Sequence, residues 1–228
     1  MTRPWSILVV DDDPHIREVV RIALDAQGMR AFEAAGGQAA LTELGRRRID
    51  LVILDIGMPG MDGFAAIKAI RAGSDVPVLF LTAQDAEVER ILGFELGADD
   101  FVGKPFSPRE LMLRVRAILA RGRPSAQEAL EHGALRLVPA RHEAAFDGRA
   151  LHLTATEFAL LAALMRAPGQ VFDRNRLIDA AYGGHAQLSG RTVDSHIRNI
   201  RAKAAALGAD GVVETVHGVG VRLGPCAP

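Results

Sequence analysis

The segment Asp50–Phe64 reads DLVILDIGMPGMDGF. It begins with an apolar run without a polar position, Leu51–Leu54, which a carboxylate, Asp55, follows at once. A short uninterrupted run of this kind is typical of a strand buried on both faces, as in parallel sheets covered by helices. The Gly, Pro and Asp residues after Asp55 end the strand and open a loop. The segment therefore predicts a central parallel strand with an aspartate at its carboxyl end.

Similar apolar runs lie on both sides of this segment, at Ile7–Val10, Val78–Leu81 and Phe101–Val102. Between them, residues 14–27 and 88–96 carry apolar side chains at helical spacing. This alternation predicts βαβ units and an α/β domain. Ser107-Pro108, an N-cap followed by a first-turn proline, predicts one more helix that ends near residue 119. The sequence RGRPSAQ that follows is typical of an interdomain linker.

A different pattern begins after this linker. Three short stretches separated by turn residues predict a small antiparallel sheet, namely Ala134–Val138, Glu143–Phe146 and Ala150–Leu153. Thr154 and Glu157 have the spacing of a capping box and predict the start of a helix. We expect further helices at residues 174–181 and 190–206, and then two strands around His217. Three helices followed by a hairpin predict an α+β winged helix-turn-helix domain.

The composition agrees with two globular domains. The chain has 228 residues, of which 49% are hydrophobic and 24% charged, and its formal net charge is -1. We place the first domain at residues 1–121, a linker at 122–129 and the second domain at 130–228. The sequence shows neither a membrane-spanning run nor the apolar core of a signal peptide, so we expect a cytoplasmic protein without membrane contact. A single cysteine, Cys226, excludes an internal disulfide, and we expect it in a disordered terminus.

Acidic and hydroxyl residues follow the predicted parallel strands. Asp11 and Asp12 come after the first, Asp55 after the central one, and Thr82 and Lys104 after the next two. Loops at this edge of an open α/β sheet converge on a ligand site. Clustered carboxylates favour a hard divalent cation such as Mg²⁺, and the cation together with Lys104 would stabilise negative charge arriving at Asp55. This pattern indicates phosphoryl transfer to a carboxylate.

The segments ILVVDDDP, DLVILDIGMPGMDGF, VPVLFLTAQ and GADDFVGKPFSPREL resemble the receiver domain of two-component response regulators over residues 5–121. The resemblance implies a flavodoxin-like, doubly wound sheet of five parallel strands in the order 2-1-3-4-5. It implies that Asp55 is the phosphoacceptor for a sensor histidine kinase, that Asp11 and Asp12 bind Mg²⁺ with Asp55 and the Gly57 carbonyl, and that Thr82 and Lys104 contact the phosphoryl oxygens. Phe101 matches the aromatic residue that changes rotamer with Thr82 on activation.

The helix expected at residues 190–206 has two faces. Val193, Ile197 and Ile200 form an apolar stripe, and the opposite face carries Arg191, Ser195, Arg198, Asn199 and Ala202. Arginine can bind guanine and asparagine adenine in the major groove, while Thr192, His196 and Arg201 would contact phosphates. An ordinary solvated helix face is the alternative.

The segments LTATEFALL, RTVDSHIRNIRAK and ETVHGVGVRL resemble the winged-helix domain of OmpR/PhoB-type response regulators over residues 130–224. The resemblance implies that the long helix reads the major groove and that the wing, with Thr215 and His217, reaches the minor groove. Asn199 stands where the family commonly has arginine, and His217 and Val221 stand where Arg and Tyr are common. We expect a site preference that differs from that of typical relatives.

The resemblance also implies a dimer that forms on phosphorylation, binds repeated promoter half-sites in double-stranded DNA and meets RNA polymerase there. We expect Arg90 to pair with Glu110, and Asp100 with Arg114, across a two-fold axis. The expected interface comprises Arg90, Ile91, Phe94, Asp99, Asp100, Glu110, Met112 and Arg114. Ordinary surface charges are the alternative.

Three rival functions remain open. A haloacid-dehalogenase-type phosphohydrolase also forms an aspartyl phosphate, but it needs a second Asp two residues on, where this chain has Gly57. We therefore expect no enzyme. The other rivals are a protein-binding receiver with an inert effector and a constitutive regulator that never uses phosphate. The complete set of pocket residues argues against the last.

Overall fold

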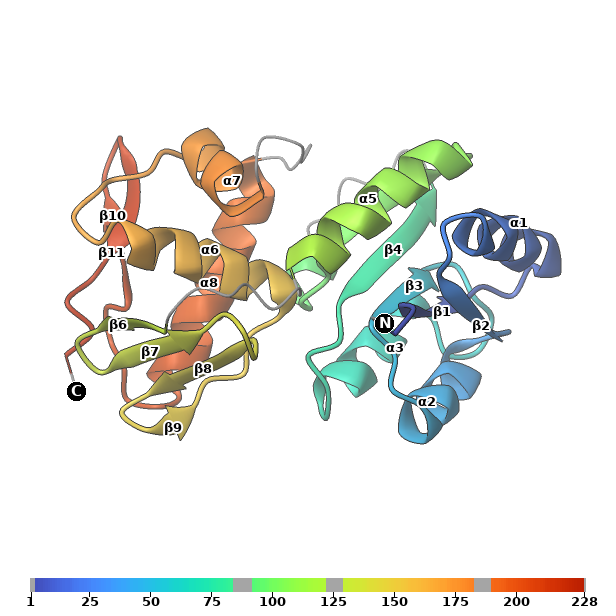
Figure 1. The fold of residues 1–228 in the computed structure, drawn as a ribbon, viewed down its shortest axis with the longest axis horizontal. Helices are drawn as coiled ribbons and strands as arrows, with labels where there is room; N and C mark the ends of the chain where they lie inside the picture. The colour runs from blue at the N-terminus through green and yellow to red at the C-terminus, as the bar shows by residue number, and fades with distance from the viewer. Residues whose placement is uncertain (1–2, 84–91, 122–128, 183–189, 228) are drawn as a thin grey trace. The chain divides into compact units, whose positions relative to one another are not determined.

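The computed structural model describes residues 3–83, 92–121, 129–182 and 190–227. The chain divides into two compact units, Met1–Leu119 and Ala120–Pro228. The five-stranded sheet lies in the first unit, and the four-stranded and two-stranded sheets lie in the second (Figure 1). Each unit has its own hydrophobic core. No helix in the described part of the chain is long and apolar enough to cross a membrane.

A five-stranded parallel sheet forms the centre of the first unit. Its strands lie in the order β2-β1-β3-β4-β5, as the receiver resemblance implies. The strands are β1 (Ser6–Val10), β2 (Arg30–Ala34), β3 (Leu51–Asp55), β4 (Val78–Ala83) and β5 (Asp100–Lys104). Strands β1 and β3 are buried at every position, which explains their uninterrupted apolar sequences.

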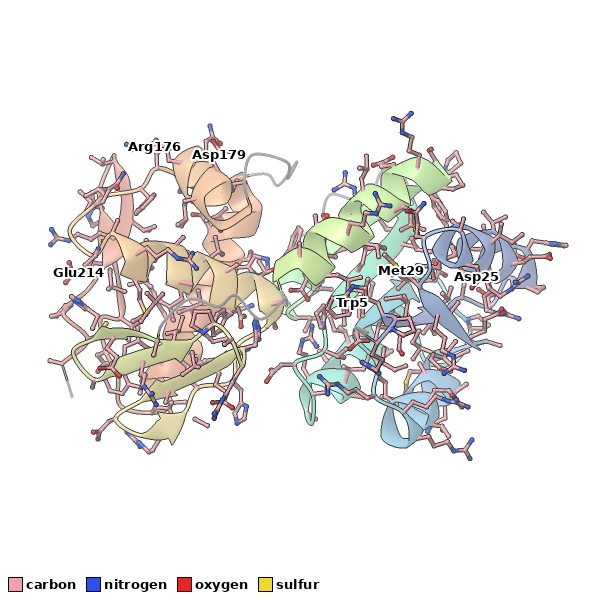
Figure 2. The ribbon with its side chains drawn as sticks, viewed as in Figure 1. Trp5, Asp25, Met29, Arg176, Asp179 and Glu214 are labelled. Carbon is pink, nitrogen blue, oxygen red and sulfur yellow. The ribbon has the colours of Figure 1, made fainter. Side chains whose placement is uncertain are left out.

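Helices cover both faces of this sheet. The helices α1 (Pro14–Asp25) and α5 (Pro108–Arg121) lie over one face, and α2 (Gly37–Arg46) and α3 (Gly63–Arg71) over the other (Figure 1). Alternate strand residues such as Ile53 and Leu79 share a core with α1 and α5. Met29 and Trp5, labelled in Figure 2, add to this core.

The sequence pattern did not reveal β2. Its sequence, RAFEA, mixes charged and apolar residues because it is an edge strand, with Arg30 and Glu33 exposed. The other four strands were predicted, although β5 is longer than the apolar pair Phe101–Val102. Asp13 caps α1 by accepting a hydrogen bond from the His15 amide. Residues 88–91 of the expected helix at 88–96 lie outside the described part of the chain.

The second unit starts with a four-stranded antiparallel sheet and ends with a hairpin. The sheet comprises β6 (Leu130–His132), β7 (Leu135–Val138), β8 (Glu143–Phe146) and β9 (Arg149–Ala150). The helices are α6 (Ala155–Arg166), α7 (Arg174–Tyr182) and α8 (Gly190–Ala205), and the hairpin is β10 (Val213–Val216) with β11 (Gly220–Leu223). The structure thus confirms the expected helix and hairpin order. The strand expected over 150–153 ends earlier, because Leu151 and Leu153 leave the sheet and enter the core.

The helix α6 lies at the centre of this unit. Nearly all its residues from Ala155 to Met165 are buried. The predicted capping box is present, since the Thr154 side chain accepts from the Glu157 amide and Glu157 accepts from the Thr154 amide. The buried Glu157 carboxylate also meets Lys203 of α8 at 2.7 Å, which joins the two helices.

The prediction of a disordered end around Cys226 is wrong. Its side chain is fully buried in the core of the second unit, and its carbonyl accepts a hydrogen bond of 2.8 Å from the Ala134 amide. Burial raises the pKa of the Cys226 thiol to about 11. The sequence around Cys226, GPCAP, carries no periodic apolar pattern and so did not indicate that the chain folds back against the β6–β7 turn.

Candidate functional site

The acidic residues predicted from the sequence meet at the carboxyl ends of the parallel strands. Asp55 ends β3, Asp11 directly follows β1, and Asp12 comes next in the chain. One carboxylate oxygen from each lies within 4.8 Å of the other two. Asp11 and Asp55 are buried, whereas Asp12 is exposed. The pocket therefore has a buried floor and an open side.

Lys104, the last residue of β5, binds two of these carboxylates. Its Nζ lies 2.7 Å from Asp55 Oδ1 and 2.8 Å from Asp11 Oδ2. Burial lowers the pKa of Lys104, but its hydrogen bonds and charge attraction to Asp11 and Asp55 outweigh that effect and raise the pKa. The ammonium group therefore stays charged and holds Asp55 in place.

Asp55 keeps its proton more strongly than an ordinary aspartate. Burial is the main cause of the raised pKa, the charges of Asp11 and Asp12 act in the same direction, and Lys104 opposes them. Three carboxylates against one ammonium leave the pocket negative overall. An added cation would therefore be attracted to this pocket and would favour the ionised form of Asp55.

The donor set fits Mg²⁺. Hard divalent cations bind carboxylate and carbonyl oxygens, and Mg²⁺ takes few protein ligands because it keeps several waters. Asp11, Asp12 and Asp55 offer three such oxygens at the carboxyl ends of the neighbouring strands β1 and β3. Gly57 lies against Asp55, since a Cβ added to it would be 3.7 Å from Asp55 Oδ2. The absence of a side chain there leaves room beside the carboxylate.

Thr82 and Phe101 lie on β4 and β5, the strands that follow β3 in the sheet. Both are buried, Thr82 in β4 and Phe101 in β5. The ring of Phe101 packs between Phe94 and Phe80, with centroid distances of 4.6 and 5.3 Å. A Cβ on Gly93 would come within 2.4 Å of the Phe101 ring, so this inward ring position requires glycine there.

Arg17 of α1 also touches the pocket, although no motif in the sequence marks it. Its Nη1 donates to the carbonyl oxygens of Asp11 and Asp12, at 2.8 and 3.2 Å. A basic residue on an amphipathic helix is usually interpreted as a solvated surface charge, so its position gave no signal.

Several residues of the expected dimer face are buried within their own unit. Phe94, Asp99, Asp100 and Met112 are all buried in the single chain, and their part in a dimer stays a prediction. Asp99 accepts a 2.9 Å hydrogen bond from the Val78 amide and anchors the start of β5. Met112 belongs to the core between α5 and the sheet.

Asp100 and Arg114, which we expect to pair across a two-fold axis in a dimer, are also bonded to each other within one chain. Arg114 binds Asp100 of the same chain at 3.1 Å and Glu110, one helical turn away, at 3.1 Å. These bonds outweigh the opposing effect of burial and raise the pKa of Arg114. Of this predicted set, Glu110 is exposed. Arg90 and Ile91 lie outside the described residues.

In the second unit, α8 differs from the expected recognition helix at two positions. Ser195 and His196 are buried, so the prediction that they contact DNA is wrong. The reason is that α8 packs against α6, α7 and β10, which covers more of its circumference than one apolar stripe. Arg198 is exposed and Asn199 half-buried. The side chains of Arg191 and Thr192 lie outside the described part.

The hairpin β10–β11 is joined to α8 by Arg201. Its Nε donates to the Val213 carbonyl at 2.8 Å, and its Nη2 donates to Thr215 Oγ1 at 2.7 Å. A groove of about 420 Å³ lies between this helix and the hairpin. Its lining includes Arg174, Asp194, Arg198, Arg201, Thr215 and Gly218. Three arginines and one aspartate make this groove basic, although Arg174 and Asp194 neutralise each other at 3.0 Å.

Comparisons with known proteins match both units. The family model "Response regulator receiver domain" matches residues 7–116, and "Transcriptional regulatory protein, C terminal" matches residues 148–223. "DNA-binding response regulator MtrA" of Mycolicibacterium smegmatis is 41% identical over 225 residues, which cover 98% of this chain and 99% of that protein. "Sensory transduction protein RegX3" of Mycobacterium tuberculosis is 40% identical and covers 96% of this chain and 98% of that protein.

A solved structure agrees with these relatives. The response regulator DrrB of Thermotoga maritima, described as an OmpR/PhoB homologue, is 28% identical with a TM-score of 0.53, and the match covers 97% of this chain and 100% of that one. The family models, the full-length relatives and the two folds all agree. The chain therefore belongs to the OmpR/PhoB-type family of DNA-binding response regulators of two-component systems.

Proposed function

We propose that Asp55 accepts a phosphoryl group from a sensor histidine kinase and that this modification controls DNA binding by the second unit. The observation that carries this proposal is the position of Lys104, whose ammonium bridges Asp55 and Asp11 at the carboxyl edge of the sheet. A cation already in contact with the acceptor carboxylate stabilises the negative charge that arrives with phosphate.

In the proposed reaction, an Asp55 oxygen attacks the phosphorus of the kinase phosphohistidine. The new P–O bond forms as the P–N bond breaks, and the imidazole keeps the electron pair. Lys104 and the Thr82 hydroxyl would hold the phosphoryl oxygens. Bound Mg²⁺, held by Asp11, Asp12, Asp55 and the Gly57 carbonyl, would neutralise charge on the transferred group.

The chain itself would carry out no further catalysis. A phosphohydrolase of the aspartyl phosphate type needs a general acid two residues after its acceptor, and this chain has Gly57 there. Nothing at that position can protonate a leaving group or activate water. We infer that the phosphoryl group leaves Asp55 slowly and acts as a signal.

For the output, we propose that Arg198 and Asn199 read bases in the major groove. Arg191 would lie on the same base-reading face, and Thr192 and Arg201 would bind phosphates. Thr215 and His217 would approach the minor groove from the wing. Phosphorylation would shift Thr82 and Phe101, favour a homodimer that involves Glu110 and the pair Asp100–Arg114, and bring two DNA-binding units to repeated promoter sites. There the protein would meet RNA polymerase, in the cytoplasm where the promoter DNA lies.

A gel-shift experiment tests this function. The probe is duplex DNA that the wild-type chain enriches from a randomised pool, and the variants are Asp55→Asn and Asp62→Asn. Asp62 is an acidic residue on the same loop that caps α3. Acetyl phosphate with Mg²⁺ should strengthen DNA binding by wild type and by Asp62→Asn, but not by Asp55→Asn. The proposal would be contradicted if acetyl phosphate strengthened DNA binding by Asp55→Asn as much as by wild type. It would also be contradicted if acetyl phosphate did not phosphorylate the wild-type chain.

A further inference from the structure

Arg17 holds the backbone that carries two of the three pocket carboxylates. The residue lies in the first turns of α1, and its side chain is 15% exposed. A single nitrogen, Nη1, donates to both the Asp11 carbonyl (2.8 Å) and the Asp12 carbonyl (3.2 Å). These two carbonyls belong to the short connection between β1 and α1. The guanidinium therefore closes this connection from the helix side.

Other bonds fix Asp11 from the sheet side. Its amide donates to the Ala34 carbonyl at 3.2 Å, and its Oδ1 accepts from the Asp13 amide at 2.9 Å. Asp12, by contrast, is exposed. Its orientation depends on the backbone between Asp11 and Asp13, and the bond from Arg17 restrains that backbone.

Glu33 of β2 fixes the guanidinium itself. Arg17 Nε lies 3.3 Å from Glu33 Oε2, so the arginine is held between an edge strand and the acidic loop. Because two carbonyls and one carboxylate accept from one side chain, few arginine rotamers satisfy all three. A charge-assisted contact of this kind orients the backbone more firmly than solvent would.

We propose that Arg17 is a positioning residue that sets the Asp11–Asp12 pair for Mg²⁺ and so raises the Mg²⁺ affinity of the pocket; this rests on the proposed metal site. Two effects of Arg17 have opposite signs. Its positive charge repels the cation, whereas its hydrogen bonds hold the ligands in place. Removing the side chain therefore tightens Mg²⁺ binding if charge dominates and weakens it if positioning dominates.

Arg21 supplies a matched control on the same helix. It carries the same charge, lies one turn further along α1 and also contacts Glu33, at 3.5 Å. Its other partners are Glu18 and Asp25, the latter labelled in Figure 2 near the end of α1. Within the part of the chain that the structure describes, Arg21 makes no bond to the Asp11 or Asp12 carbonyl. The substitution Arg21→Gln therefore removes a charge and leaves the backbone bonds of Arg17 in place.

The experiment measures Mg²⁺ binding to the full chain by titration calorimetry, together with the Mg²⁺-induced rise in melting temperature. We expect Arg17→Gln to raise the Mg²⁺ Kd about tenfold, which is the lower end for lost outer contacts of a metal site. Arg17→Lys keeps the positive charge but loses the planar guanidinium, whose several N–H donors bind the two carbonyls and Glu33. This substitution should also weaken Mg²⁺ binding. Arg21→Gln should stay within about twofold of wild type.

Phosphorylation by acetyl phosphate gives a second measurement. The Mg²⁺ concentration for half-maximal rate should rise in Arg17→Gln, while the rate at saturating Mg²⁺ approaches that of wild type. A general loss of folding would lower both the rate and the melting temperature in EDTA. If Arg17→Gln fails to fold, the Mg²⁺ Kd of Arg17→Lys and of Glu33→Gln is compared with that of wild type instead. Both substitutions should raise it.

Two results would overturn the inference: Arg17→Gln binding Mg²⁺ as tightly as wild type or more tightly, or Arg21→Gln losing as much affinity as Arg17→Gln. Failure of the proposed function is distinguishable from either, because wild type itself would then show no Mg²⁺ binding and no phosphorylation.

Discussion

Asp55 combines burial with a cluster of like charges. Its pKa is raised because burial disfavours the carboxylate and because Asp11 and Asp12 add negative charge, while Lys104 opposes both. A raised pKa in the folded state means that the stability from this group is full below its unfolded pKa and is lost as pH rises through the folded value. Ionised Asp55 therefore destabilises the fold at neutral pH.

From this sign we predict that Asp55→Asn raises the free energy of unfolding at pH 7 in EDTA. The gain should shrink as pH falls through the raised pKa of Asp55 toward the ordinary aspartate value of 3.8, because wild-type Asp55 takes up its proton above that value. Urea unfolding at the two pH values measures both effects. A variant less stable than wild type at pH 7 would show that the bond to Lys104 outweighs burial and repulsion.

Cys226 gives a prediction that concerns folding alone. Burial raises its thiol pKa from 9.0 to about 11. Stability should therefore fall as pH rises from about 9 through about 11, because the unfolded chain ionises first. At pH 8 we expect the native thiol to react with a disulfide reagent at least about tenfold more slowly than in urea. Since the chain has a single cysteine, the signal is unambiguous. Equal rates would contradict the buried position.

At the scale of elements, the sequence pattern predicted the strands that are buried along their whole length. It missed the strand in which exposed charged residues and apolar residues are mixed. The strands β1, β3 and β4 appear as uninterrupted apolar runs because helices cover both faces of the sheet. The edge strand β2 carries Arg30 and Glu33 and shows no such run. The pocket was predictable because its residues follow strand ends, whereas Arg17 acts through backbone carbonyls that leave no mark in a sequence.

The recognition helix shows the same limit. The predicted apolar stripe on α8 correctly separated the buried Val193 and Ile197 from the exposed Arg198. The same prediction wrongly placed Ser195 and His196 on the exposed side. Small and aromatic polar residues tolerate burial, and α8 has neighbours on several sides. Periodicity gives the direction of one buried face but not its width, which tertiary packing decides.

The bond from Arg201 to the wing gives a prediction at this scale. We expect Thr215→Val, which removes the hydroxyl and no charge, to weaken DNA binding several-fold, because Thr215 Oγ1 accepts from Arg201 and so holds β10 against α8. The slope of log K against log salt should stay unchanged, since each lost phosphate contact would lower it by about 1. Arg222→Gln is the control, because Arg222 pairs with Glu214 within the wing. Wild-type affinity in Thr215→Val would show that the wing needs no such bond.

At the scale of the whole molecule, the question is how phosphate at one unit changes DNA binding by the other. The pair Asp100–Arg114 is already satisfied within one chain, so a dimer gains little from these two charges unless they change partners. On α5, the apolar side chain of Leu113 lies one helical turn from Glu110 and is 61% exposed, so it can supply apolar contact area to a dimer. Burying it against a second copy would stabilise the dimer by about 1 kcal/mol per chain.

We therefore predict that Leu113→Ser weakens the phosphorylation-dependent dimer about fivefold or more. Ile22→Ser is the matched control, because Ile22 is 56% exposed on α1, outside the expected dimer face. Sedimentation with acetyl phosphate and Mg²⁺ measures the dimer constant for wild type and both variants. If Leu113→Ser changed the dimer constant no more than Ile22→Ser does, the dimer would use a surface other than the one around Leu113. If only Leu113→Ser loses the dimer and, with it, cooperative binding to repeated half-sites, α5 is the element that links the phosphoryl group to DNA.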